Sequence, residues 1–179
     1  MQADAAQILM REYFELQAIY ESYNAQSLTI KEWSVSIGIA ALLAAYARPV
    51  SEAGGRAGVI LAALVAVPFY LTDALWKSFQ MAYLPRLQAI EGGFRDAAVG
   101  GEIAIVQGLV PLQGVASWSA AYGSDPVDAD AGKVDLFLEA LTSHAVLLPH
   151  VVLLGLGLFM AVVFPPRLAA AATERRERR

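Results

Sequence analysis

The run of residues from Ala145 to Phe164 constrains the fold of this chain more than any other feature. It contains one ionisable side chain, that of His150, and it stops at the Pro165–Pro166 pair. A helix of about 20 apolar residues has the length needed to cross the hydrocarbon core of a bilayer. The run therefore predicts a transmembrane helix at 145–164, with an arginine-rich tail at 165–179 in water or among the lipid headgroups.

Two earlier segments also predict membrane spans. Residues 58–76 have the required length, although the acidic Asp73 lies among them. Residues 33–47 are short for a span, but Trp33 and Tyr46 stand at the two ends, where aromatic side chains suit the membrane–water interface. Composition agrees with this interpretation, because 57% of the residues are hydrophobic and 17% are charged, against about 25% charged residues in soluble domains.

The segment 103–122 is ambiguous. It carries no charge, but glutamine, glycine and proline dilute its apolar residues, so it is either a fourth span or a re-entrant segment. With three spans, the two sides of the membrane carry nearly equal numbers of basic residues. With four spans, both termini lie in the cytoplasm, and most of the basic residues lie there too. The positive-inside rule therefore favours four spans and hydropathy favours three. An acidic loop at 123–143 follows.

Two polar segments next to the spans carry matching stripes of aromatic and aliphatic residues. One is the amphipathic N-terminal segment 1–32, and the other is an amphipathic extension of the second span at 77–92, which we expect to end at the Gly92–Gly93 pair. Residues spaced by three and four lie on one face of a helix. We expect the two stripes to pack against each other as an antiparallel helical pair, through Leu9, Tyr13, Leu16, Tyr20, Phe79 and Tyr83.

These observations predict an all-α, polytopic membrane bundle that forms a single domain over residues 1–179. It has three or four transmembrane helices, and a cytoplasmic helical hairpin extends the first two spans. The polar N-terminus lacks the basic region and the early apolar run of a cleaved signal peptide. We expect a multi-pass protein of the bacterial cytoplasmic (inner) membrane.

His150 and Asp73 are the polar candidates within the predicted spans, and each has two interpretations. His150 is either a cofactor or proton-relay residue, or a neutral histidine that hydrogen-bonds to a neighbouring helix. Asp73 either lines an ion or proton pathway, or forms an ion pair one helical turn away with Lys77. The structural interpretation is favoured for both residues, so no cofactor is predicted.

The residues present exclude several kinds of functional site and give no support for others. The chain has no cysteine, which excludes disulfides, thiol catalysis and cysteine-based metal sites. Glycine-rich phosphate loops, paired catalytic carboxylates and the HExxH and GxSxG motifs are all missing. We therefore predict no catalytic residue and no metal site, and an enzyme is not favoured. The basic tail has no aromatic or motif context that would indicate nucleic-acid binding.

Residues 3–93 resemble the two-transmembrane SLATT-type effectors of bacterial conflict systems. The resemblance lies in the order of helix, span, turn, span and aromatic-basic helix, and in the segments EWSVSIGIAALLAAY and LWKSFQMAYLPRL. It implies a protein that acts on membranes when a linked sensor signals.

The sequence therefore predicts a non-enzymatic integral membrane protein that self-assembles into a homo-oligomer in the lipid bilayer, as a membrane-perturbing effector. The alternative is an accessory subunit of a larger membrane complex, in which the same helix stripes bind a partner. A small transporter or channel is the third hypothesis, and it requires more polar groups in the spans than we find.

Overall fold

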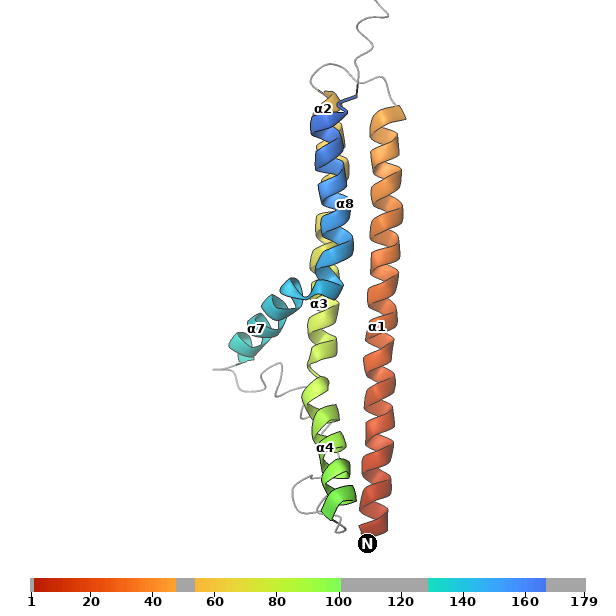
Figure 1. Ribbon diagram of the computed structural model, residues 1–179, viewed down its shortest axis with the longest axis vertical. Helices are drawn as coiled ribbons and strands as arrows, with labels where there is room; N and C mark the ends of the chain where they lie inside the picture. Colours follow the sequence, from red (N-terminus) through yellow and green to blue (C-terminus); the bar gives the residue numbers. More distant parts are fainter. Residues whose placement is uncertain (1, 48–53, 101–128, 167–179) are drawn as a thin grey trace, which may run out of the picture. The chain divides into compact units, whose positions relative to one another are not determined.

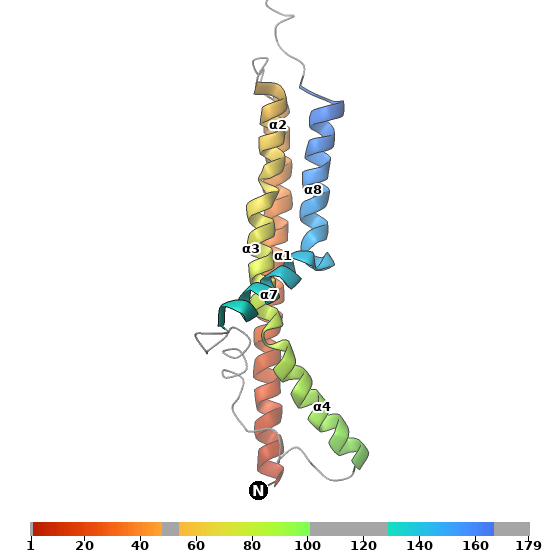
Figure 2. The same cartoon turned by 90° about the vertical axis from the view of Figure 1, so that its left-hand side faces the viewer.

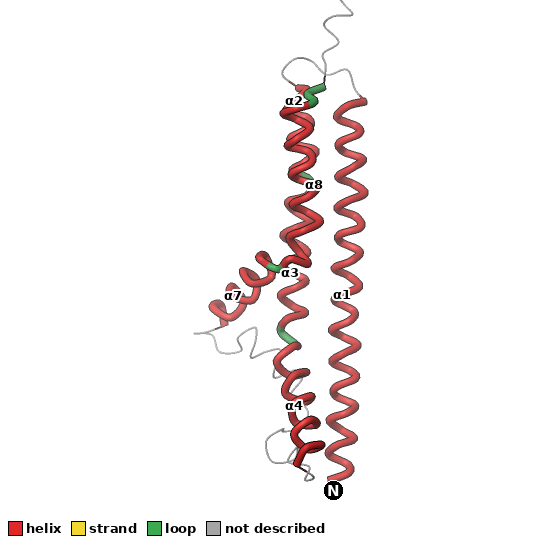
Figure 3. The backbone as a smooth tube through the Cα atoms, viewed as in Figure 1, coloured by secondary structure: helices red, strands yellow, loops and turns green. Residues whose placement is uncertain are grey.

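The computed structural model describes residues 2–47, 54–100 and 129–166 (Figure 1). These residues form helices and no strand, as the colouring of Figure 3 shows. The helices are α1 (Gln2–Ala47), α2 (Gly54–Leu64), α3 (Ala66–Met81), α4 (Leu84–Gly100), α7 (Ala129–Thr142) and α8 (His144–Val163). The all-α class predicted from the sequence is confirmed.

Three helical stretches of the described chain are long and apolar enough to cross a membrane. They are Ala6–Ala47, Gly55–Arg95 and His144–Val163, and each covers all or all but one residue of a segment for which the sequence predicts a span. The ambiguous segment 103–122 and most of the basic tail lie outside the described residues, and so do residues 123–128 of the predicted acidic loop. The rest of that loop, up to Thr142, is helical instead, because it forms α7.

The chain divides into two compact units. Unit 1 comprises residues 1–27 and 74–140, and unit 2 comprises residues 28–73 and 141–179. Helices α1 and α3 each contribute to both units.

Helix α1 is uninterrupted over 46 residues. The sequence suggested an amphipathic segment at 1–32 and a separate span at 33–47. Residues 24–32 contain neither glycine nor proline, so nothing there stops the helix before the predicted span.

Helices α2 and α3 cover the second predicted span, with a break between them at Val65. Pro68 accounts for this break, because a proline ring has no N–H and crowds the carbonyl four residues earlier. The Gly54–Gly55 pair, expected to lie in a turn, begins α2. The predicted helix end at Gly92–Gly93 is also wrong, because α4 continues to Gly100. Phe94, beyond the glycines, packs in the core of unit 1, and this packing offsets the roughly 1 kcal/mol that each glycine costs a helix.

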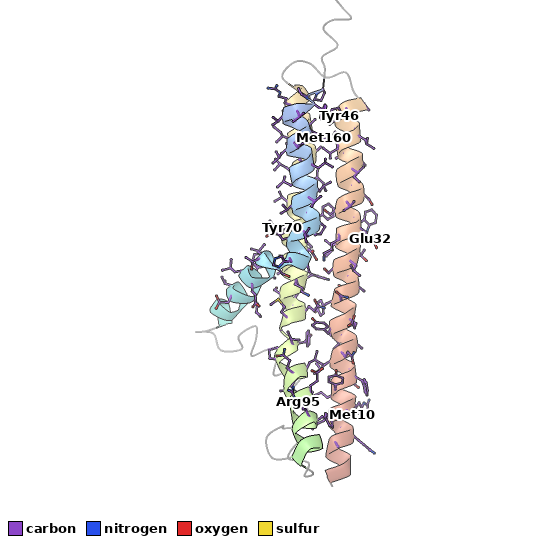
Figure 4. The ribbon with its side chains drawn as sticks, in the orientation of Figure 1. Met10, Glu32, Tyr46, Tyr70, Arg95 and Met160 are labelled. Carbon is purple, nitrogen blue, oxygen red and sulfur yellow. The ribbon has the colours of Figure 1, made fainter. Side chains whose placement is uncertain are left out.

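Within unit 2, helices α1, α2–α3 and α8 lie side by side (Figures 1 and 2). Ser34 contacts His150 at one end of α8, and Tyr46 donates a hydrogen bond of 2.7 Å to the Phe164 carbonyl at the other. Helices α1 and α8 are therefore parallel. Figure 4 shows Tyr46 beside Met160, whose carbonyl accepts a second hydrogen bond of 3.3 Å from the same hydroxyl.

Small residues allow the helices of unit 2 to pack closely. A Cβ atom added at Gly157 would collide with Ala63 of α2, and one added at Gly38 would collide with the Leu153 side chain of α8. Membrane helices use such residues because lipid provides no hydrophobic force to bring them together. The core around these contacts consists of Leu42, Val59, Ala62, Ala66, Leu153 and Ala161.

Candidate functional site: a buried ionic cluster in unit 2

The most unusual feature of unit 2 is an ion pair between α1 and α3. The Lys31 ammonium lies 3.1 Å from Asp73 Oδ1 and 2.9 Å from Oδ2. The Asp73 side chain is fully buried, and that of Lys31 is 18% exposed. Removing a charge from water costs several kcal/mol, and the lysine that faces both oxygens of Asp73 offsets this cost.

His150 brings the third helix into the same cluster. Its Nε2 atom lies 3.4 Å from Asp73 Oδ2, and its Nδ1 atom lies 2.9 Å from the Ser34 hydroxyl of α1. The imidazole is 2% exposed. Within the described part of the chain, no group forms a hydrogen bond of acceptable geometry with Nε2. His150 thus lies between a hydroxyl on one helix and a carboxylate on another.

The local sequence explains how these groups meet. Lys31 and Ser34 are three residues apart on α1, so both face the neighbouring helices. Tyr70 and Asp73 have the same spacing on α3. The Tyr70 ring packs on the imidazole of His150 with 5.9 Å between the ring centres, and its hydroxyl donates a hydrogen bond of 2.7 Å to the Leu141 carbonyl. The Tyr70 side chain is labelled in Figure 4.

The cluster contains a serine, a histidine and an aspartate in contact, but it is not arranged for nucleophilic catalysis. Ser34 has no exposed surface, so a substrate has no approach to its hydroxyl. Ser34 also lies in the middle of α1, where the neighbouring backbone N–H groups bond within the helix. An oxyanion hole needs such donors aimed at the substrate.

A pocket of about 260 Å³ lies beside the cluster, between α3 and α8. His150 and Tyr70 form part of its wall, and the rest is aliphatic. No group of three metal-binding side chains occurs in the described segments. The pocket therefore offers a surface for hydrocarbon, and the polar chemistry of this region lies in the cluster.

The stripe residues predicted from the sequence all lie in unit 1. Leu16 is buried with Leu87 and Ile90, and Tyr13, Tyr20 and Tyr83 pack around them. Leu9 is also buried, and the ring of Phe79 packs on Tyr23, which also contacts Tyr83.

Two tyrosines of unit 1, outside the apolar parts of the helices, have perturbed acidity. The hydrogen bond of 2.8 Å from the Tyr13 hydroxyl to Glu91 raises the pKa of Tyr13. Burial, together with the nearby Tyr23, raises the pKa of Tyr83.

Sequence reasoning missed two features of these sites. In unit 1, Arg86 and Glu12 form a buried ion pair between α4 and α1. In unit 2, Asp73 pairs with Lys31, whereas the sequence suggested Lys77, which donates a hydrogen bond of 2.8 Å to Gln80. The available signal was the spacing by four and three of the polar residues Ser27, Lys31 and Ser34 along α1.

Comparisons with protein-family models, with curated proteins and with solved structures gave no significant match to this chain.

Proposed function

We propose that this chain is a non-enzymatic, multi-pass membrane protein that self-assembles through the N-terminal part of α1. The supporting observation is the exposure of large apolar side chains in unit 1, on a part of α1 that is rich in polar residues. Ile8 is 44% exposed and Phe14 is 59% exposed. Lipid accounts for exposed apolar residues on the spans, but not for those on a polar segment.

The exposed face of this segment has an ordered pattern. At about 100° per residue, the Arg11–Glu15 ion pair lies between two apolar edges. Met10 and Phe14 form one edge, and Ile8 and Ile19 form the other. The opposite face of the helix is buried in unit 1. We call the exposed face, residues 8, 10, 11, 14, 15 and 19, the α1 outer face.

A second copy of the chain is the occupant that this face suits. Copies in one membrane have the same orientation, so their α1 outer faces lie at the same depth and can meet around a two-fold axis. The face carries one acid and one base, and both are largely exposed. Two copies therefore do not repel each other, and Arg11 of each can bind Glu15 of the other.

The order of helices in unit 2 supports three membrane crossings. The chain leaves unit 2 after Asp73 and returns at Leu141 at the same end of the bundle, where Tyr70 binds the Leu141 carbonyl. A single crossing at 103–122 would return the chain at the opposite end. We therefore infer that the N-terminal segment and the C-terminal tail lie on opposite sides of the membrane.

As an effector, the assembled protein acts on the bilayer itself, in line with the resemblance to SLATT-type effectors. Reconstitution into vesicles of phosphatidylethanolamine and phosphatidylglycerol tests this activity. We expect an entrapped dye to leak as protein is added, and the leakage to require assembly. Vesicles that stay sealed at a protein density giving full assembly argue against an effector.

Mass measurement of the protein purified in a mild detergent tests self-assembly. We expect a mass that is a multiple of 19.1 kDa, and the double variant Met10→Ser/Phe14→Ser should be monomeric. A matched control is Ile39→Ala/Leu43→Ala, which removes similarly exposed apolar residues from the membrane part of the same helix. This control should keep the oligomer. A monomeric wild type contradicts the proposal, and a stoichiometric foreign chain supports the accessory-subunit alternative.

A further inference from the structure

We propose that His150, together with Asp73 and Lys31, forms a proton-binding site inside the helical bundle of unit 2. Uptake of one proton by His150 weakens the ion pair between Lys31 and Asp73. This proposal stands apart from the proposed self-assembly, because it rests on unit 2 alone.

The first argument is the position of the imidazole. His150 Nε2 faces Asp73 Oδ2 at 3.4 Å and, among the described residues, forms no hydrogen bond, although the side chain is 98% buried. Nearly all buried polar groups in proteins have a hydrogen-bond partner. A neutral imidazole with its proton on Nε2 can donate toward the carboxylate, and an imidazolium does so with a stronger, charge-assisted bond while both nitrogens are donors. One N–H can then point at the carboxylate and the other at the Ser34 oxygen, 2.9 Å away.

The second argument is the charge balance of the cluster. Described groups from two other helices face His150: Ser34 of α1, and Asp73 and Tyr70 of α3. Lys31 faces the same Asp73 oxygen from α1. With His150 neutral, lysine and aspartate balance to a net charge of zero. One added proton raises the net charge to +1, and the single carboxylate is then shared by two cations.

The third argument is the access of Lys31 to water. Lys31 is the one member of the ion pair with exposed surface, 18% of its side chain. Its long aliphatic stem lets the ammonium reach toward the membrane surface while the stem stays in the bundle. Protonation therefore has a defined consequence: Lys31 moves toward water and Asp73 pairs with the imidazolium. The proton comes from water, and no electron transfer is involved.

Nitrogen NMR of histidine tests proton uptake directly. The chain has two histidines, so the full-length His144→Gln variant, labelled with ¹⁵N-histidine in lipid nanodiscs, reports on His150 alone. We expect reversible conversion from the neutral to the imidazolium pattern between pH 8 and pH 5. A His150 signal that stays neutral down to pH 5 overturns the proposal.

Acid variants test the role of the carboxylate. In Asp73→Asn the conversion should no longer occur above pH 5, whereas Asp135→Asn, which removes an acid of α7, should leave it unchanged. Unchanged conversion in Asp73→Asn overturns the proposal. If Asp73→Asn does not fold, as judged by gel filtration in detergent, Asp73→Glu replaces it. The conversion should survive in Asp73→Glu, and its loss there also contradicts the assignment.

Lysine footprinting tests the displacement. Brief reductive methylation followed by mass spectrometry gives the labelling of Lys31 relative to the other lysines of the same chain. We expect this ratio to rise at least two-fold between pH 8 and pH 5.5, and to stay constant in His150→Gln. A constant ratio in the wild type shows that Lys31 is not displaced, which overturns that part of the proposal.

Discussion

Glu12 and Arg86, which lie 74 residues apart in the sequence, form a bidentate ion pair with nitrogen–oxygen distances of 2.9 and 2.7 Å. The two side chains are 9% and 4% exposed. Paired hydrogen bonds of this geometry are among the strongest between side chains, and they fix orientation as well as distance. This ion pair therefore fixes the register between α1 and α4 in unit 1.

Replacing Arg86 by alanine should destabilise unit 1 by roughly 3 kcal/mol, because it leaves the Glu12 carboxylate buried without its main cation. Hydrogen exchange of α1 and α4 amides in detergent measures the loss. Arg95→Ala is the matched control, because it removes an exposed arginine from the same helix as Arg86. Equal effects of the two variants would show that burial of the Arg86 pair does not matter.

Replacing Lys31 by methionine should destabilise unit 2 by roughly 3 kcal/mol at pH 8, because the buried Asp73 carboxylate loses its cation while His150 is neutral. The double variant Lys31→Met/Asp73→Leu should recover most of this loss, since apolar pairs of similar volume often replace buried ion pairs without cost. Thermal aggregation midpoints in detergent rank the three proteins. A double variant that is less stable than Lys31→Met would contradict this account.

Two neighbouring glycines of α8 should respond oppositely to the same substitution. Gly157→Ala places a methyl group against Ala63, whose short side chain cannot move aside, and should cost about 1–3 kcal/mol. Gly155→Ala meets nothing within 4 Å and should be neutral or slightly stabilising. Steric trapping or SDS denaturation compares the two free energies of unfolding. A loss at Gly155 as large as that at Gly157 would refute the packing argument.

Single cysteines test the inferred topology, since the native chain has none to interfere. A membrane-impermeant maleimide should label Ala5→Cys and Thr173→Cys from opposite sides of intact cells. Ser124→Cys should behave like Ala5→Cys. Labelling of positions 5 and 173 from the same side would instead support a fourth span at 103–122.

The helical class and the three apolar spans could be predicted from the sequence because both depend on local properties. Hydrophobic run length sets the spans, and the 3–4 spacing of aromatic residues marks the inner face of the N-terminal helix. Helix ends were less predictable. Gly92 and Gly93 weaken a helix, but the tertiary packing of Phe94 decides whether the helix continues.

The ionic cluster could not be predicted as a unit, because its members come from three helices and their pairing depends on packing. His150 and Asp73 were recognised singly. Lys31 was not recognised, because it lies just before the predicted span at 33–47. Together with Ser34 it forms a polar stripe on α1. In lipid that stripe marks the buried face of the helix, whereas in water it would mark the exposed one.

Helix α1 runs unbroken through both units, and this continuity has a mechanical consequence. The backbone hydrogen bonds of a helix resist unwinding, so an axial rotation applied at one point is passed along it. Turning α1 by the angle of one residue, about 100°, would carry Lys31 and Ser34 away from the partners they now face. The α1 outer face at residues 8–19 therefore belongs to the same uninterrupted helix as Lys31 and Ser34, which supply two of the side chains of the buried ionic cluster.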